Sequence, residues 1–489
     1  MKWGGFALLI AVSAPLAAVP TTAPKPRIIV ISDIGNEPDD QMSLVRYLTY
    51  SNEVETEGLI ACTSTWLRTN PHPEMMHSVI AAYGQVRDNL LKHGQGWPTQ
   101  AALDALVTSG QPGYGMATTG PDKMSAGAAE IVAAADRPDP RALWITLWGG
   151  ANTLAQALIH VRDTRTPAEV DKFVAKLRVS SISDQDDAGP WMRREFPKLF
   201  YIVKPSPPDG EEYQSATWTG ISGDLYYRMP GADTSLVTNE WLDKNIRSKG
   251  PLGAHYPKFL FIMEGDTPSY LGLIPNGLNS DVSPNWGGWG GRYLHRQPYG
   301  ETHDIWSQGG DLFYRATSAD TLVGNDGIEH TSDHATIWRW RQAYQNDFAA
   351  RMDWTIKDYA HANHPPVVVV NGDASGAPIA MTVVAGEKIT LDASASHDPD
   401  GNKLSYHWFH YAEAGAGKGI DLADVSVADG ETARATVTAN AACRKSWIPQ
   451  FAHCSGVGVA HIILAVTDNG TPALTRYRRV VLTVNANKQ

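Results

Sequence analysis

Residues 27–40, RIIVISDIGNEPDD, set the architecture expected for this chain. The run from Arg27 to Asp33 has the continuous apolar pattern of a strand that is buried on both faces. A polar turn that contains glycine follows at once, and residues 43–48 then show the apolar periodicity of a helix. This stretch therefore predicts the first strand, turn and helix of an α/β sheet.

The same alternation continues along the chain. Further strands are expected at residues 54–63, 142–147, 177–182, 199–203 and 259–263, with helices at 75–91 and 152–161. Such alternation is typical of an open, mostly parallel sheet with helices on both faces. Ligands of such sheets bind beyond the carboxyl ends of the strands, so functional residues are expected in the turns that follow them.

The pattern changes near residue 364, where helical periodicity stops. Short strands are expected at residues 367–371, 388–391, 404–410, 433–437 and 461–466, separated by turn signals such as DPDG and DNG. This spacing is typical of an immunoglobulin-like β-sandwich. We therefore expect an α/β domain over residues 24–362 and an all-β domain over residues 363–489.

The N-terminus has the pattern of an export signal. Lys2 supplies a positive charge, residues 6–12 are apolar, and residues 14–18 are small. These features predict a cleaved signal peptide over residues 1–23 and a periplasmic or extracellular protein. The apolar run is too short to span a membrane, and no later segment is long enough.

The three cysteines fit an exported protein. Cys443 and Cys454 lie close together in the C-terminal part and are expected to form a disulfide. Cys62 falls within an expected strand and is interpreted as a buried free thiol. No cysteine or histidine pattern resembles a zinc site.

Composition narrows the possible partners. The chain has 489 residues and a formal net charge of −11, so its acidic surface argues against nucleic acid as a partner. Its 16 tryptophans, most of them between Trp66 and Trp354, suggest contact with carbohydrate. Ordinary core packing is the alternative explanation for any one of them.

The turn after the first strand carries Asp33, Glu37, Asp39 and Asp40. Crowding these carboxylates at a strand end costs free energy unless a cation or sugar hydroxyls offset it. A hard divalent ion such as calcium prefers oxygen ligands of this kind. The alternative is a solvated acidic turn in which Asp39 or Asp40 interacts with the dipole of the next helix.

This pattern resembles the N-terminal motif of the nucleoside hydrolases, calcium-dependent N-ribosidases with an open α/β sheet. The resemblance implies that Asp33 is a metal ligand and general base, Asp39 a sugar ligand and Asp40 a metal ligand. The chain departs from the motif by two extra residues near Glu37, and Ile31 replaces an upstream aspartate. The sugar geometry is therefore expected to differ.

Two later segments are similar to the same family. Residues 148–155, WGGANTLA, resemble a strand end at which a backbone carbonyl completes the metal shell, which implies the carbonyl of Trp148. Residues 263–268, MEGDTP, resemble the segment that supplies the last metal carboxylate, which implies Asp266. In a parallel sheet such strand ends converge on one edge.

Over its whole length the chain is similar to a family of secreted bacterial proteins described as cellulose-binding, with a nucleoside-hydrolase-like domain and a characteristic C-terminal domain. The matching segments are SDIGNEPDDQMSLVR, SISDQDDAGPW, GPLGAHYP, MEGDTPSYLGLIPNGLN, NWGGWGGRY and DFAARMDW. The resemblance implies carbohydrate contact more directly than it implies turnover.

Other polar and aromatic residues are interpreted as sugar-binding walls, because carboxylates and amides bind hydroxyls and tryptophan stacks on sugar C–H faces. The expected substrate-binding residues are Asn36, Glu37, Asp39, Asp184, Asp187, Trp191, Glu264, Asn276, Trp286, Trp289 and Arg292. The alternatives are a second cation site or a solvated loop for residues 182–191, core packing for the tryptophans, and a turn for Asn276.

The leaving-group acid has several candidates. His303, His330 and His334 each lie near an aspartate in the sequence, although a structural role is the simpler interpretation. Glu37, Glu264 and Asp184 are further candidates for this acid.

Three functional hypotheses follow. The first is a secreted, calcium-dependent glycoside hydrolase acting on a glycan-derived sugar, such as a furanoside or an oligosaccharide. The second is a non-catalytic carbohydrate-binding protein that keeps the metal site, and the third is a periplasmic nucleoside hydrolase.

Overall fold

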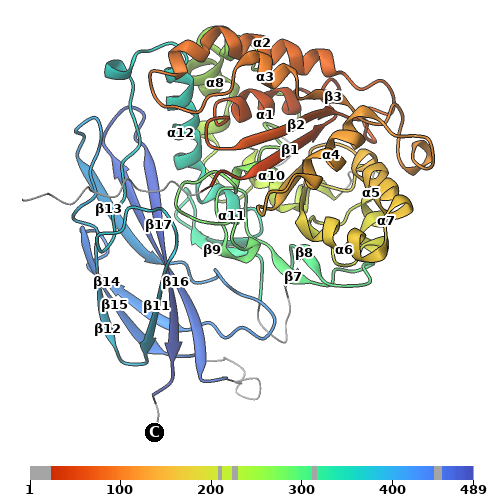
Figure 1. The fold of residues 1–489 in the computed structure, drawn as a ribbon. Coiled ribbons are helices and arrows are strands. Elements are labelled where there is room, and N and C mark those ends of the chain that lie inside the picture. Colours follow the sequence, from red (N-terminus) through yellow and green to blue (C-terminus); the bar gives the residue numbers. More distant parts are fainter. Residues whose placement is uncertain (1–23, 208–211, 223–228, 311–315, 445–453, 488–489) are drawn as a thin grey trace, which may run out of the picture.

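The computed structural model describes residues 24–207, 212–222, 229–310, 316–444 and 454–487 (Figure 1). The expected signal peptide lies outside the described residues. An α/β part comes first and a smaller all-β part packs against its side. In the described part of the chain, no helix is both long and apolar enough to cross a membrane.

The α/β part is built on an eight-stranded sheet in the order β3-β2-β1-β4-β5-β6-β8-β7. Its strands are β1 (Arg27–Ser32), β2 (Glu55–Ala61), β3 (Val107–Ser109), β4 (Leu143–Leu147), β5 (Leu177–Ser181), β6 (Phe200–Ile202), β7 (Leu294–Arg296) and β8 (Ile305–Ser307). All neighbours are parallel except β7 and β8. The order reverses at β1, which makes the gap between the ends of β1 and β4 a topological switch point.

Helices cover both faces of this sheet, as the sequence predicted. One layer contains α1 (Pro38–Leu48), α2 (Pro73–Leu90), α3 (Gln100–Asp104) and α12 (Arg341–Trp354); the other contains α4 (Ala126–Asp136), α5 (Asn152–Thr164), α6 (Pro167–Lys176) and α7 (Ala188–Glu195) (Figure 1). Ile28 and Val30 of β1 belong to the first core, and Ile29 and Ile31 belong to the second. This alternation explains why β1 is apolar throughout.

Shorter elements lie between β6 and α12. They are α8 (Asn239–Leu242), α9 (Gly250–Ala254), α10 (Pro268–Leu271), β9 (Asp320–Val323), β10 (Glu329–Ser332) and α11 (Ala335–Trp338). The structure changes from mixed α/β to all-β between His361 and Ile379.

The all-β part contains two sheets that enclose a separate apolar core. One sheet has the order β11 (Ile379–Val384), β17 (Thr475–Asn485), β16 (Val457–Asp468) and β13 (Leu404–His410); the other has β12 (Lys388–Asp392), β15 (Arg434–Ala441) and β14 (Asp424–Ala428). Cys443 and Cys454 form a disulfide, and Cys62 is a buried free thiol in the α/β part. The result is a sandwich, although β11 pairs with β17 in parallel.

Two expected strands are wrong. Residues 259–263 form no strand, because β8 occupies the position beside β6 and leaves Leu260 and Phe261 exposed. Residues 367–371 make only isolated bridges, Val367 with His397 and Val370 with Asp373. An apolar run therefore predicted burial at Val370 but not its place in a sheet.

Charged and aromatic side chains join the two parts. Asp347 on α12 pairs with Arg351 at 2.9 Å and with Arg476 on β17 at 2.6 Å. Tyr411 and Tyr477 of the sandwich belong to the same apolar core as α1 and α2. The sandwich is thus docked through a shared core and a buried ion pair.

The first prediction concerns Asp347. Burial alone would raise its pKa, but the charges of Arg476 and Arg351 more than offset this and lower the pKa to about 2. Because the folded pKa lies below the unfolded value, this stabilisation is present above about pH 4 and is lost as the pH falls through about 2. Asp347→Asn should lower the free energy of unfolding at neutral pH by about 3 kcal/mol, measured by denaturant titration.

The matched control is Asp392→Asn, which removes an exposed ion pair with Arg434 on the sandwich surface. Its effect on the free energy of unfolding should be much smaller, because exposed ion pairs contribute little to stability. Equal losses in both variants, or a difference between wild type and Asp347→Asn that persists at pH 2, would contradict this role for the buried pair.

Candidate active site

The candidate site lies at the switch point between β1 and β4. Asp33 directly follows β1, and Gly149 follows β4. The two are in close contact, since a Cβ on Gly149 would lie 2.7 Å from Oδ1 of Asp33. Asp39 and Asp40 stand in the first turn of α1, which begins at Pro38 and therefore earlier than expected.

Asp266 joins this group from a segment far along the chain. One carboxylate oxygen from each of Asp39, Asp40 and Asp266 lies within 4.8 Å of the others. The segment is anchored on one side by Trp148, whose Nε1 donates to Oγ of Ser269 at 2.9 Å. The structure therefore brings Asp33, Asp39, Asp40 and Asp266 together.

These carboxylates are buried in an electrostatically unfavourable arrangement. Burial raises the pKa of Asp33 to about 6, although hydrogen bonds from Ser64, its own backbone and Asp40 oppose the shift. Burial and then neighbouring carboxylates raise the pKa values of Asp39, Asp40 and Asp266 well above the usual range. Within the described residues, no arginine, lysine or histidine forms an ion pair with any of them. A bound cation would remove this repulsion.

The donor set fits a hard divalent cation. Oδ1 of Asp39 and Oδ2 of Asp266 are buried without a hydrogen-bond partner among the described residues, and the side-chain atoms that could coordinate a cation are all oxygens. The carbonyl of Trp148 already accepts a hydrogen bond from Nε2 of Gln185 at 2.6 Å. A carbonyl oxygen has two lone pairs, so one remains for a cation.

The mouth of the site is formed by the turn between β1 and α1. Asn36 is exposed there, and Glu37 is partly buried. Burial, followed by the charge of Asp33, raises the pKa of Glu37 to about 7. Both side chains are accessible to a ligand that approaches the cluster.

An aromatic wall that the sequence analysis did not identify stands beside the carboxylates. It consists of Trp66, Tyr213 and Trp218, with ring centroids 6.4 Å apart for Trp66 and Tyr213 and 5.3 Å apart for Tyr213 and Trp218. The Trp218 ring contacts Gly265, next to Asp266, and 41% of Trp66 is exposed. Trp66 follows β2, so the strand-end rule was a usable signal for it.

A histidine also lies beside the turn. The ring of His72 packs on Gly35, where a Cβ would lie 2.6 Å from Cδ2 of His72. Nδ1 of His72 lies 2.6 Å from Oε1 of Glu74. No described residue hydrogen-bonds to Nε2, and the side chain is 34% exposed. Nothing in the sequence pattern marks this contact.

Several expected substrate-binding residues have structural roles instead. Asp184 forms a buried bidentate pair with Arg193, and Glu264 forms one with Arg46. Because both carboxylates pair with buried arginines, the expectation that they act as sugar ligands or as the leaving-group acid is wrong. Glu264 also fixes the segment that carries Asp266 against α1.

Asp187 and Trp191, from the same segment, take part in local hydrogen bonding and packing. Oδ1 of Asp187 accepts a hydrogen bond from the backbone of Met116, and Trp191 packs on Phe196 and Arg162. Trp191 therefore belongs to the helical layer rather than to a sugar platform.

The expected platform at residues 285–293 is wrong, because this loop forms the junction with the sandwich. Trp286 packs against His461, and Trp289 is fully buried against Tyr477. Arg292 is buried in an ion pair with Asp320 at 2.8 Å. Oδ1 of Asn276 accepts a hydrogen bond from the backbone N–H of Leu278, and its backbone carbonyl accepts one from the N–H of Tyr477. This is the turn role that was the alternative interpretation of Asn276.

The histidines expected as acids are not brought to the carboxylates by any recorded contact. His330 pairs with Asp326 at 2.8 Å, and His303 is hydrogen-bonded to Thr302 at 3.2 Å. His334 is held against Gly220 and has a lowered pKa because of burial. His72 is the histidine that contacts the turn of the site.

The second prediction tests the cation. Calcium should raise the midpoint temperature of unfolding of the wild type, by an amount equivalent to about 2.7 kcal/mol at a hundredfold excess over Kd. Asp266→Asn should abolish this calcium response. In chelator the same variant should be more stable than the wild type, because it removes a source of like-charge repulsion.

Asp171→Asn is the control, because Asp171 lies in an exposed ion pair with Lys198 on the outer surface. This variant should keep the full calcium response. A calcium response in Asp266→Asn equal to that of the wild type would contradict the proposed cation site. Differential scanning calorimetry measures the midpoint temperatures, and a parallel series with magnesium shows which of the two ions stabilises the protein more.

Comparison with known proteins places the chain in a family. A model described as "Cellulose-binding Sde182, nucleoside hydrolase-like domain" matches residues 27–293. A second, "Cellulose-binding protein Sde0182, C-terminal domain", matches residues 388–484. The comparison with curated proteins finds no match.

Among solved structures, a nucleoside hydrolase-related hypothetical protein from Saccharophagus degradans, described as associated with carbohydrate metabolism, is 37% identical. The match covers 95% of this chain and 100% of that one, with a TM-score of 0.76. The effector protein XOO4466 is 12% identical, over 69% of this chain and 95% of its own, with a TM-score of 0.33, too low to inform the function. The chain belongs to the family of cellulose-binding proteins with a nucleoside hydrolase-like domain and its own C-terminal domain.

Proposed function

We propose that this chain is an exported, calcium-dependent glycoside hydrolase that acts on a glycan-derived sugar such as a furanoside. Residues 24–362 are the proposed catalytic unit, and residues 363–489 are an accessory domain. The observation that carries the proposal is the buried cluster of Asp33, Asp39, Asp40 and Asp266, which is bordered by an aromatic wall and by the exposed Asn36 of the adjacent turn. A purely structural ion site has no need of an exposed tryptophan beside it.

The proposed metal ligands are Asp33, Asp40, Asp266 and the carbonyl of Trp148. A calcium ion held there would supply positive charge that positions a water molecule and makes it more acidic. Asp33 would accept a proton from the water as it attacks the anomeric carbon. The oxygen of that water becomes the new anomeric hydroxyl.

The sugar would be held by groups around the cluster. Oδ1 of Asp39 has no hydrogen-bond partner in the described structure and is a natural acceptor for a sugar hydroxyl, while Asn36 and Glu37 are accessible in the adjacent turn. Trp66 presents an apolar ring on which the C–H face of a sugar can stack. These contacts orient the anomeric carbon towards the attacking water.

We assign the leaving-group acid to His72. Glu74 accepts a hydrogen bond from Nδ1, so the doubly protonated imidazolium form of the ring would carry the transferable proton on Nε2. The glycosidic oxygen takes this proton as its bond to the anomeric carbon breaks. This assignment replaces the histidines expected from sequence adjacency.

The second candidate function is carbohydrate binding without turnover, which the printed description of the family favours. Binding alone would use the same aromatic wall and would need no proton donor. Substitution of Asp33 distinguishes the two functions, because only turnover needs its carboxylate as a proton acceptor.

The third prediction separates these functions. Mature protein with calcium is incubated with plant polysaccharides, furanosyl oligosaccharides and nucleosides, and NMR detects new anomeric signals. Asp33→Asn should reduce turnover by at least about 10²-fold, because it removes the proton acceptor, while sugar affinity changes little. Asp171→Asn is the control for activity.

Chelator should abolish the same signals. Silence across the panel with intact folding and measurable glycan binding would reject catalysis and support the binding function. Release of base from nucleosides alone would instead identify a nucleoside hydrolase.

The fourth prediction tests His72. His72→Gln should lower kcat by about 10²-fold for an alkyl glycoside, whose leaving oxygen needs a proton. The loss should nearly vanish for an aryl glycoside with an acidic phenol as leaving group. His77→Gln is the matched control, because His77 is exposed on α2 and pairs with Asp104 at 2.8 Å. Equal losses with both substrates would rule His72 out as the acid.

A further inference from the structure

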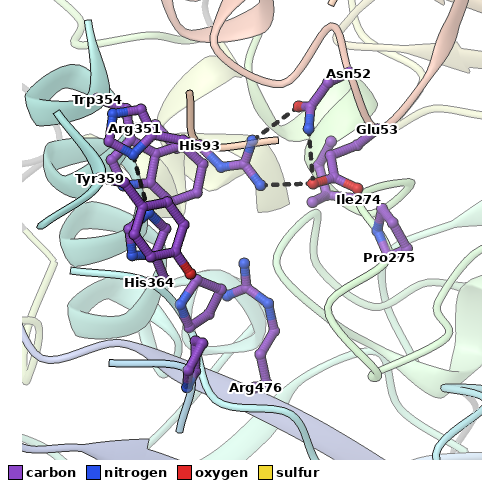
Figure 2. Close-up of a pocket in the computed structure, with 12 residues that line it drawn as sticks. Asn52, Glu53, His93, Ile274, Pro275, Arg351, Trp354, Tyr359, His364 and Arg476 are labelled. Atoms are coloured by element: carbon purple, nitrogen blue, oxygen red, sulfur yellow. Dashed lines mark hydrogen bonds and ion pairs between the residues drawn. The ribbon is translucent and has the colours of Figure 1, made fainter. Parts of the chain in front are cut away.

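A cavity lies between the α/β part and the sandwich. It has a volume of about 350 Å³ and is lined by Asn52 and Glu53 before β2, by α12, by Tyr359 and His364, and by Arg476 of β17 (Figure 2). Asp33 follows β1, whereas Glu53 precedes the parallel strand β2. The cavity therefore lies at the opposite end of the sheet from the carboxylate cluster.

One side of this cavity is aromatic. Tyr359 stacks on His364 with centroids 3.8 Å apart and an angle of 15° between the rings. His93 and Trp354 stack behind them, at 5.2 Å and 5.3 Å from His364. Tyr359 nevertheless remains 42% exposed, so part of its ring is available to a ligand. Figure 2 shows these rings grouped on one side, with Glu53 and Arg476 away from them.

The polar side chains leave both donors and acceptors available. Oε1 of Glu53 accepts from Arg351 at 2.9 Å, and Nη1 of Arg476 donates to Asp347 at 2.6 Å. No described residue pairs with Oε2 of Glu53, with Nε or Nη2 of Arg476, or with the hydroxyl of Tyr359. The cavity thus offers an acceptor, two donors and a group that can be either.

Its charges are balanced. The carboxylates of Glu53 and Asp347 face the guanidinium groups of Arg351 and Arg476. A charged ligand would leave one side of this network uncompensated, whereas a neutral polyol would not. The volume falls at the lower end of the range for small-molecule sites.

We propose that this interdomain cavity is a binding site for one or two neutral sugar units. Sugar hydroxyls both donate and accept, which matches the free polar atoms, and a sugar C–H face matches the ring of Tyr359. The inference goes beyond the proposed function, because it requires neither the metal nor catalysis. A sugar here contacts both parts of the chain and stabilises their docking.

The test is calorimetric titration of the full chain with cellobiose, xylobiose and maltose at millimolar concentrations. At least one disaccharide should bind, and Tyr359→Ala should weaken binding by about fivefold or more. Tyr359→Phe keeps the ring and should lose less. Tyr299→Ala is the control, because Tyr299 is fully exposed on the loop between β7 and β8, and it should bind as the wild type does.

Glu53→Gln is a second variant, which keeps the shape of the side chain but removes its negative charge. It should also weaken sugar binding, because the free carboxylate oxygen is lost as an acceptor. Failure of all three sugars to bind the wild type would overturn the proposal, as would wild-type affinity in both Tyr359→Ala and Glu53→Gln. Trp66→Ala alters only the wall of the carboxylate site. Loss of all binding in Trp66→Ala alone would place the sugar there, overturning this proposal while leaving the proposed function intact.

Discussion

Several carboxylates are buried together at the end of β1, and the surrounding elements must hold them there against their mutual repulsion. Asp33, Asp39, Asp40 and Asp266 repel one another, and no described cationic side chain offsets their charge. Only rigid surroundings hold such groups together, and here the rigidity comes from Gly149 against Asp33 and from the buried pair of Glu264 with Arg46. Repulsion between neighbouring carboxylates is typical of a cation site that contains no metal.

Two classes of buried charged residue in the described part of the chain have different physical roles. Asp33, Asp39, Asp40 and Asp266 form no ion pair with a described residue, which makes them suited to binding a ligand. Those between the α/β part and the sandwich, such as Asp347 and Asp320, are buried with arginine partners and fix the docking of the domains. The sequence alone does not show to which of these classes a carboxylate belongs, because the assignment depends on its neighbours in the folded protein.

The loop at residues 285–293 illustrates why the sugar platform was misplaced. Glycines and tryptophans favour close approach of a partner, and the sequence pattern is the same whether that partner is a sugar or another domain. Here the sandwich fills the role, with Tyr477 against Trp289 and His461 against Trp286. The aromatic wall of the candidate site comes instead from Trp66, Tyr213 and Trp218, which lie on separate segments without periodicity.

Local sequence was enough to predict most strands, the parallel sheet, the sandwich and the carboxylates after β1, because strand periodicity and strand-end chemistry are properties of adjacent residues. It also supplied Asp266 through its resemblance to a known motif. Only the tertiary structure decided that β8 replaces residues 259–263 beside β6, that Glu264 and Asp184 are bound to arginines, and that His72 packs on Gly35. Those contacts join residues that are distant in the chain, and their free energy depends on packing and burial that no local pattern encodes.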